Sequence, residues 1–418
     1  MMQNILISLI AIITVSIVGI IVTTFSRRWI HEKRFARLDR LKIEYKERLD
    51  HILKNESISI ASLRQEIESD PLRSEALEEV MYRHYNENFH FLSTIEALGY
   101  IEKYQSTLSS HASIQKKAFA ADRIGRFRHN GSVALLEESA RNALKNTEFI
   151  NVIFKSLALI ATDEALKSIV VLLPDALKHH SVSQKNAEMV LLTFSPKYLD
   201  LLLEACSLYR INAQKEAQLV MLDTISRCSS STHSIHYCLD ILQSGDAELS
   251  VRALRHLSNV SLENSFDLSP VIQMLKHPKW FVRVQAIGVL KHRLERDEAL
   301  KFLFLLEDSA WQVRRNFAEL LVSYGANVLT MMVQIIQGND NYAKESIAEA
   351  IQMEGFFAEL LSYISPESAY YDNAKIIVQY LNNIGLIDWE NNIDLGAYPE
   401  LTRQTITNLL ATKENSHA

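Results

Sequence analysis

Residues 246–257 read DAELSVRALRHL, and this stretch decides the fold because close relatives of it return twice further along the chain. Residues 277–290 (HPKWFVRVQAIGVL) and 308–321 (DSAWQVRRNFAELL) align with it without gaps. The Val-Arg pairs of the three stretches begin at positions 251, 282 and 313, and each step is thirty-one residues. Self-similarity at a fixed period of roughly 20–50 residues is typical of repeat architectures. We therefore expect translationally related units in place of a single globule.

The register continues in a weaker form on both sides of these stretches. Basic residues keep a spacing of thirty or thirty-one within two series, which are Lys155, Lys185 and Lys215, then Arg314, Lys344 and Lys375. A unit of this length holds two helices of about a dozen residues and two turns, and it cannot bury its apolar stripe alone. Neighbouring hairpins must therefore stack. We expect an α-solenoid over residues 57–412 and a C-terminal tail over 413–418.

Composition supports an all-α chain that folds. Of 418 residues, 48% are hydrophobic and 22% charged, with only eleven glycines and seven prolines. The net charge of −6 argues against a protein that coats nucleic acid, which usually carries a basic balance. The three cysteines have no regular spacing, so they imply no disulfide framework and suit a reducing compartment.

The aligned segments resemble HEAT repeats, especially the short, phycobilisome-lyase-like type. That family's pattern is an Asp, often followed by Pro, then Val-Arg, with a later Ala and Leu. His277-Pro278 departs from it by placing His at the Asp position, and Phe317 replaces the Ala of the third segment. The resemblance implies an all-α solenoid of helical hairpins. The fold class we expect is this solenoid preceded by one transmembrane helix, which the N-terminal residues predict. The resemblance also implies a ladder along the stack, in which the Arg of one repeat pairs with the Asp of the same or the next repeat, formed by Asp246, Arg252, Arg283, Asp308 and Arg314.

The resemblance further implies that partners bind the inner surface formed by the second helices. That surface would carry a basic strip made of Arg255, His256, Gln285, Lys291, His292, Arg293, Arg315 and Asn316. The strip is either a solvated helix face or a site for an acidic protein segment, an anionic lipid surface or a nucleotide-like messenger. Trp280, Phe281 and Trp311 occupy equivalent turn positions. They form either an exposed ridge or, as the favoured reading, packing between turns.

The N-terminal region contains a long uncharged stretch. Ile5 to Phe25 reads ILISLIAIITVSIVGIIVTTF, and a helix of roughly 20 such residues spans the hydrocarbon core. A cleaved signal peptide is disfavoured because residues 1–4 lack a basic start and the exit lacks a small-x-small pattern. Basic residues follow the stretch, and positive flanks stay in the cytoplasm. We expect a short tail over 1–4, a transmembrane anchor over 5–26, and a cytoplasmic solenoid at a cell inner membrane.

Residues 27–56 predict a basic, amphipathic juxtamembrane helix. Its apolar residues recur every three or four positions, at Phe35, Leu38, Leu41, Tyr45, Leu49 and Ile52. This stripe needs a cover. It docks on the first repeats, pairs with a second copy as a short coiled coil, or lies along anionic headgroups.

Motifs for catalysis are absent from the sequence. No phosphate-binding loop, GxSxG, HExxH or CxxC occurs. One cluster invites a zinc interpretation, Cys228, His233, His236 and Cys238, but its spacing is more typical of a polar loop that enters a helix. A di-iron HEAT-type hydroxylase would resemble a set of His-Glu pairs, whereas His31-Glu32 is the one such pair here. We therefore expect no catalytic residue, no metal and no cofactor.

The function that fits these features is a membrane-tethered, protein-binding scaffold or adaptor. By analogy of architecture it would be an accessory subunit of a bacterial inner-membrane assembly of the envelope or polysaccharide-export type. The partner would then be a membrane glycosyltransferase or a transporter, and nucleic acid is not expected. The alternative is a small-ligand-binding or lyase-like HEAT module.

Overall fold

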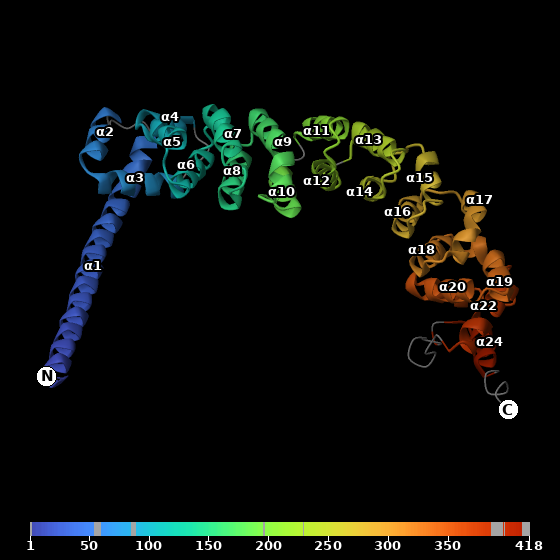
Figure 1. Cartoon of the computed structure of the whole chain (residues 1–418). Coiled ribbons are helices and arrows are strands. Elements are labelled where there is room, and N and C mark those ends of the chain that lie inside the picture. The colour runs from blue at the N-terminus through green and yellow to red at the C-terminus, as the bar shows by residue number, and fades with distance from the viewer. Residues whose placement is uncertain are drawn as a thin grey trace. The chain divides into compact units, whose positions relative to one another are not determined.

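The structure, a computed structural model, describes residues 2–53, 60–84, 89–194, 197–228, 230–385, 396 and 398–411. For residues 2–15, 49–50, 52–53, 89–90 and 410–411 it describes the backbone alone. Every regular element in these ranges is helical, which confirms the all-α prediction (Figure 1). The chain divides into two compact units, Met1–Tyr198 and Leu199–Ala418.

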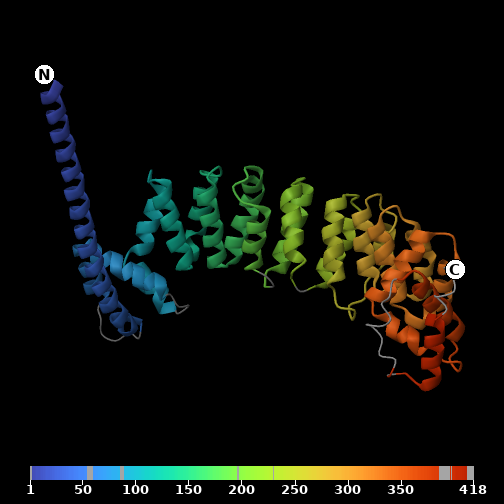
Figure 2. The ribbon, with the colours of Figure 1, turned by 90° about the horizontal axis from the view of Figure 1, so that it is seen from below.

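The first unit begins with a very long helix and continues as a series of short ones (Figures 1 and 2). Its elements are α1 (Met2–Leu53), α2 (Ile60–Ser69), α3 (Pro71–Arg83), α4 (Phe89–Ala97), α5 (Tyr100–Ser109), α6 (Ile114–Arg126), η1 (Asn130–Ser132), α7 (Val133–Arg141), α8 (Thr147–Ile160), α9 (Asp163–Lys178) and α10 (Gln184–Leu192). From α5 onward, α5, α7 and α9 form one layer, and α6 and α8 pack beside them in a second layer.

The second unit repeats this two-layer plan. Its elements are α11 (Leu199–Ile211), α12 (Lys215–Ile225), α13 (Thr232–Leu242), α14 (Ala247–Ser258), α15 (Ser269–Met274), α16 (Trp280–Leu290), α17 (Arg296–Ala299), η2 (Leu300–Glu307), α18 (Trp311–Val322), η3 (Gly325–Val328), α19 (Leu329–Gln337), α20 (Asn341–Met353), α21 (Phe356–Ser362), α22 (Tyr371–Asn383) and α24 (Glu400–Ala411). The series α12, α14, α16, α18 and α20 packs neighbour on neighbour, and α11, α13 and α15 form the other layer. Each unit is thus a stack of antiparallel hairpins, consistent with an α-solenoid.

Equivalent positions of the repeats make the core of the second unit. The Val that precedes each signature Arg is fully buried at Val282 and Val313, and the last Leu of each signature is buried at Leu257, Leu290 and Leu321. Because these residues occupy the same position in each repeat, each faces the neighbouring hairpin in the same way. One layer of apolar side chains therefore continues from hairpin to hairpin within the second unit. Burying a Val or Leu stabilises by about 1.5–3 kcal/mol each. The repeated apolar positions therefore hold the stack together.

A close helix crossing in the first unit requires glycine. Gly125 lies near the end of α6, and a Cβ built there would stand 2.5 Å from the Cα of Ser156 in α8. Ser156 itself turns its hydroxyl to its own helix and donates to the carbonyl of Val152 at 2.8 Å. Because real Cβ atoms do not approach a backbone atom so closely, α6 and α8 can only pack at this distance with glycine at 125.

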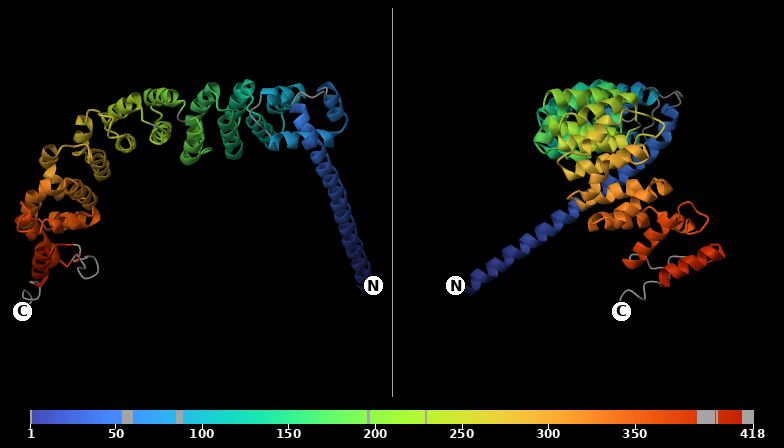
Figure 3. Two further views of the ribbon diagram at one scale, coloured as in Figure 1. Left: turned by 180° about the vertical axis from the view of Figure 1, so that it is seen from behind. Right: turned by 90° about the vertical axis from the view of Figure 1, so that its right-hand side faces the viewer.

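The long helix α1 contains two segments that the sequence predicts as separate elements. It runs without a break through Ser26, so the expected anchor (5–26) and most of the juxtamembrane segment (27–56) are one helix (Figure 3). Residues 5–15 of the expected anchor and 54–56 of the segment lie outside the residues whose side chains are described. Among the described residues no single helix is long and apolar enough to cross a membrane. One pair passes by length and composition, Trp311–Val322 with Gly325–Gln337, and it is bent by 119°.

Candidate functional site

The base of α1 is packed into the first helices of unit 1. Leu38, Leu41 and Tyr45 of the predicted stripe are buried, while Phe35, which the same periodicity assigns to the stripe, remains 59% exposed. The side chains of Leu49 and Ile52 lie outside the described part. Helix α3 is the main partner of α1. Of the three covers considered for the stripe, the structure shows docking on the first repeats.

Ion pairs reinforce this contact. Arg34 of α1 bonds to Glu75 at 2.6 Å and Arg37 to Asp70 at 2.7 Å, and both carboxylates belong to the start of α3. Hydrogen bonds at these positions prevent α1 from turning about its own axis, because the two arginines lie almost one helical turn apart. Two of the basic residues that follow the apolar stretch are thus engaged by the solenoid.

A smaller polar network closes the far end of the contact. Arg48 donates to both oxygens of Glu66, the closer at 3.0 Å, and the Tyr45 hydroxyl donates to the same carboxylate at 3.0 Å. Arg73 also bonds to Glu66. Burial acts to raise the pKa of Glu66, but hydrogen bonds from Arg48 and Tyr45 outweigh it, so the pKa lies below its ordinary value. The carboxylate therefore stays charged and holds α1 to α2.

The opposite part of α1 presents apolar side chains that no other element covers. These are Ile17, Val18, Ile20, Ile21, Val22 and Phe25, all more than half exposed. Trp29 and Ile30 continue the row, and the ammonium group of Lys33 lies 3.7 Å from the centre of the Trp29 ring. A belt of Trp with basic residues beside a bare apolar segment is typical of a membrane–water boundary.

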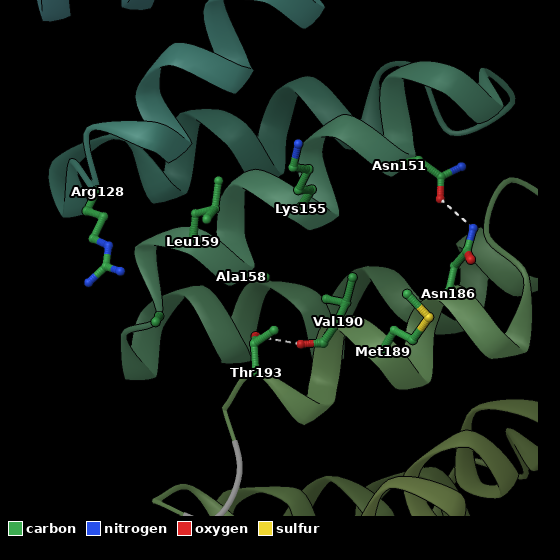
Figure 4. Close-up of a pocket in the computed structure, with 10 residues that line it drawn as sticks. Arg128, Asn151, Lys155, Ala158, Leu159, Asn186, Met189, Val190 and Thr193 are labelled. Carbon is green, nitrogen blue, oxygen red and sulfur yellow. Dashed lines mark hydrogen bonds between the residues drawn. The ribbon is translucent and has the colours of Figure 1, made fainter. Parts of the chain in front are cut away.

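A trough of about 530 Å³ lies between α8 and α10 in unit 1 (Figure 4). One face of α8 contributes Asn151, Lys155, Ala158 and Leu159, and one face of α10 contributes Asn186, Met189, Val190 and Thr193. Both sets follow helical spacing, so each helix turns one continuous stripe toward the hollow. The middle of the trough is apolar, and Met189 is 56% exposed there.

The two ends of the trough are polar. At one end Asn151 donates to the carbonyls of Thr147 (2.8 Å) and Ser181 (3.1 Å), and its own oxygen accepts from Asn186 at 3.4 Å. The side-chain oxygen of Asn186 has no donor among the described residues. Arg128, held in a left-handed conformation (φ 52°), lies at the other end. Lys155 projects from α8 above the floor of the trough (Figure 4). Its ammonium group comes within 3.9 Å of Asp122.

The predicted ladder forms at one place as the resemblance implies. Arg283 binds Asp308 of the next repeat through two parallel hydrogen bonds of 2.7 Å each, and it also donates to the carbonyl of His277 at 2.7 Å. The two side chains are 12% and 10% exposed. A bidentate pair this well covered joins α16 to the turn before α18.

The other ladder residues pair differently, and the sequence gives the reason. In the Arg283–Asp308 pair, the carboxylate stands six positions before the Arg of the following repeat. The same position in the other repeats should therefore accept the Arg of the repeat before it. Before Arg283 this position is occupied by His277, so Arg252 turns back instead and bonds to Asp223 of α12, the neighbour of α14 in the same layer, at 2.9 Å. Asp246 receives Lys215 at 2.8 Å. Arg314 bonds to the backbone carbonyl of Asp308 at 2.8 Å and has no carboxylate partner among the described residues.

The predicted basic strip is not a continuous exposed surface. His256 is fully buried, with its Nε2 atom 2.9 Å from the hydroxyl of Ser234, so the prediction that it faces a partner is wrong. It stands three residues after the buried Ala253 and therefore lies on the core side of α14. Burial lowers the pKa of His256 and favours the neutral imidazole.

The strip's other cations are mostly engaged within the chain. Arg255 lies 3.5 Å from Asp223, Lys291 is 2.7 Å from Glu354, and Arg315 is 3.0 Å from Glu319. Arg293 donates to the carbonyls of Val260 and Asn264 and lies over the Phe266 ring. Gln285 is half-buried and His292 is exposed. Asn316 bonds back to its own helix.

The cysteine and histidine cluster does not converge. Cys238 is buried, Cys228 bonds to the carbonyl of Thr224, and His233 is exposed beside Asp200 at 3.7 Å. The described part of the chain contains no group of three residues that could hold a metal ion.

The turn aromatics are more exposed than the favoured reading expects. Trp280 and Trp311 are each the first residue of a helix, and both side chains reach solvent. Phe281 is half-buried and meets Trp280 edge-on at 5.9 Å between ring centres. Packing between turns is therefore confined to Phe281, and the two tryptophans stand outside it.

No protein-family model matches this chain, and no curated protein matches it. Its function is therefore inferred from the geometry of its own residues.

Proposed function

We propose that the chain is a membrane-tethered, protein-binding scaffold. The observation that carries this proposal is α1, a single helix with bare apolar side chains at one end and a buried, ion-paired contact with α3 at the other. The two ends of this helix are therefore suited to different environments. The apolar end is suited to a bilayer and the docked end to the solenoid.

The energetics favour an apolar environment for the exposed end. Burying a side chain such as Ile, Val or Phe stabilises by about 1.5–3 kcal/mol, so the six exposed ones together contribute on the order of 10 kcal/mol. The unbroken helix then sets the distance between the bilayer and the solenoid. Twelve residues separate Ser26 from Leu38, the first buried residue of the contact, which corresponds to roughly 18 Å at about 1.5 Å per residue.

The trough in unit 1 is the proposed site for a partner. Its apolar floor suits an apolar side chain, Lys155 suits a nearby carboxylate, and the unused oxygen of Asn186 suits a backbone N–H. We therefore propose a protein segment in which an apolar residue stands beside an Asp or Glu. Tethering raises the effective concentration of such a partner at the bilayer without any new contact.

On the resemblance of the repeats, we further propose that the hairpins are HEAT-like. The same analogy favours an accessory subunit of a bacterial inner-membrane assembly, with the solenoid on the cytoplasmic side and a membrane glycosyltransferase or transporter as the partner.

Site-specific photo-crosslinking tests the trough. A photoreactive residue at Met189 of the full chain, in native membranes, should crosslink one partner through a segment that mass spectrometry identifies as apolar and acidic. The same residue at Lys178, exposed on α9, is the matched control and should not crosslink it. Lys155→Glu should abolish the Met189 crosslink. Equal products from both positions, or a product insensitive to Lys155→Glu, contradict the proposed site.

A further inference from the structure

The second unit carries a row of equivalent cations at the start of three successive helices. Arg283 of α16, Arg314 of α18 and Lys344 of α20 each stand at the fourth residue of their helix. The helices pack neighbour on neighbour, α16 on α18 and α18 on α20. The same position in the repeat therefore recurs at intervals of one helix along the edge of the stack.

The first member of the row is closed by a carboxylate of the chain itself. Arg283 uses its Nε and Nη2 atoms for the two oxygens of Asp308, and its Nη1 atom for the carbonyl of His277. The guanidinium then has a partner on each of its edges. At this position of the repeat, all three donor nitrogens of the arginine thus have an acceptor within the chain.

The next two members lack that carboxylate. Arg314 repeats the carbonyl contact through Nη1, at 2.8 Å to Asp308, yet its Nε atom is buried without a hydrogen-bond partner. Neither Arg314 nor Lys344 lies within 4.0 Å of a carboxylate among the described residues.

The sequence explains the difference. Six positions before Arg314 stands Asp308, which takes Arg283, whereas six before Lys344 stands Gly338 and six before Lys375 stands Ala369. Neither Gly338 nor Ala369 has a side-chain carboxylate. The nearby Asp340 is the N-cap of α20, where its Oδ1 atom accepts from the backbone N–H groups of Tyr342 (2.8 Å) and Ala343 (3.2 Å), and no ion pair joins it to either cation among the described residues.

Aromatic rings flank the two open cations. Trp311 stands one turn before Arg314 on α18 and is 55% exposed, and Tyr342 near the start of α20 is 64% exposed. The Arg314 guanidinium lies 4.7 Å from the centre of the Tyr342 ring. Exposed aromatic rings beside an arginine are typical of positions that dominate protein–protein binding.

We propose that the first turns of α18 and α20 bind an acidic segment of a partner protein. Arg314 and Lys344 each take one of its carboxylates, and Trp311 and Tyr342 cover the chain between them. Packed helices lie roughly 8–10 Å apart. In a polyproline II segment, which has three residues per turn and rises about 3.1 Å per residue, side chains three positions apart lie on one face about 9 Å apart. The two carboxylates therefore stand three positions apart in a segment of that conformation.

Binding of short labelled peptides to the full chain in detergent micelles tests the proposal. A peptide with Asp at every third position and Leu between should bind, and its Asn counterpart should not. Arg314→Gln and Lys344→Gln should each weaken binding about tenfold, because a charge-assisted bond contributes about 1.5–3 kcal/mol. Lys301→Gln, which removes an exposed cation from η2 of the same unit, should leave binding unchanged.

A second variant tests the missing carboxylate directly. Gly338→Asp supplies an acceptor within the chain and should also weaken peptide binding, with folding checked by circular dichroism. Equal affinity for the Asp and Asn peptides, or equal effects of Arg314→Gln and Lys301→Gln, overturns the proposal. So does binding to phosphatidylserine vesicles through Arg314 and Lys344 without peptide binding. These variants lie in unit 2, so their failure is distinguishable from failure of the α8–α10 trough.

Discussion

Gly125→Ala and Gly288→Ala add the same methyl group to two helices, and we expect stability changes of opposite sign. At Gly125 the new Cβ would lie 2.5 Å from the Cα and 2.6 Å from the Cβ of Ser156. Because both are held by the α8 backbone, α6 and α8 must separate. Overpacking of this kind costs about 1–3 kcal/mol, and the better helix propensity of Ala returns at most about 1 kcal/mol. Because the new Cβ meets a backbone atom at 2.5 Å, the upper end of this cost applies, and we expect a net loss of about 2 kcal/mol in unit 1.

At Gly288 the same substitution meets open space. No atom lies within 4 Å of the new Cβ on the exposed side of α16. Ala in a helix interior is then better than Gly by up to about 1 kcal/mol, so unit 2 should become more stable. Comparison of the two substitutions therefore separates the cost of overpacking from the gain in helix propensity.

Hydrogen exchange read by mass spectrometry is the suitable assay, because a chain of two units does not have a single free energy of unfolding. Gly125→Ala should speed exchange in α6 and α8 while leaving α16 unchanged. Gly288→Ala should slow exchange in α16. A neutral or stabilising Gly125→Ala, or effects of the same sign at both sites, would refute the close crossing of α6 and α8.

Three further predictions concern the ladder, a buried histidine and the tether. Asp308→Asn should destabilise α16 and α18 by about 3 kcal/mol, because it leaves the covered Arg283 without its charge partner; Arg314→Gln should cost less than about 1 kcal/mol, and equal costs in hydrogen exchange would contradict the ladder. The stability of unit 2 should fall as the pH drops below about 6.5, since the folded state holds the lower pKa of His256 and the unfolded chain takes up the proton first. His256→Asn should flatten that slope in urea melts, and an unchanged slope argues against it. Ile17→Arg with Ile21→Arg should release the chain from membranes, so that it stays in the bottom fractions of a flotation gradient, and continued flotation with the membranes contradicts the tether.

The sequence predicts the hairpins well because their signal is local and repeated. Val282 and Val313 share a spacing with the buried Leu positions, and that spacing alone places them in one apolar layer. The forward ladder is also readable from the sequence, since it needs an Asp six positions before the next Arg. Of the two aligned segments that follow a signature Arg, residues 277–290 lack this Asp and residues 308–321 have it at Asp308. The break at His277 is visible in the sequence once this rule is known.

Other features depend on packing that no single segment shows. The resemblance places His256 beside Arg255 on the inner surface of the second helices, yet which side of α14 faces the core depends on the helices packed against it. The trough needs Asn151 and Asn186 to face each other, and these belong to helices whose contact is not written in either one. Exposed Met189 at helical spacing from Asn186 is the signal that could have indicated it.

The accessibility of spin labels along α1 in lipid vesicles tests the central claim most directly. In a scan from position 17 to 45 of the full chain, labels at 17–25 should be accessible to oxygen and shielded from a water-soluble nickel reagent. Labels near position 35 should show the reverse, and labels at 38, 41 and 45 should be shielded from both. Water-like accessibility at 17–25, or open access at 38, 41 and 45, would contradict a helix that is anchored at one end and docked at the other.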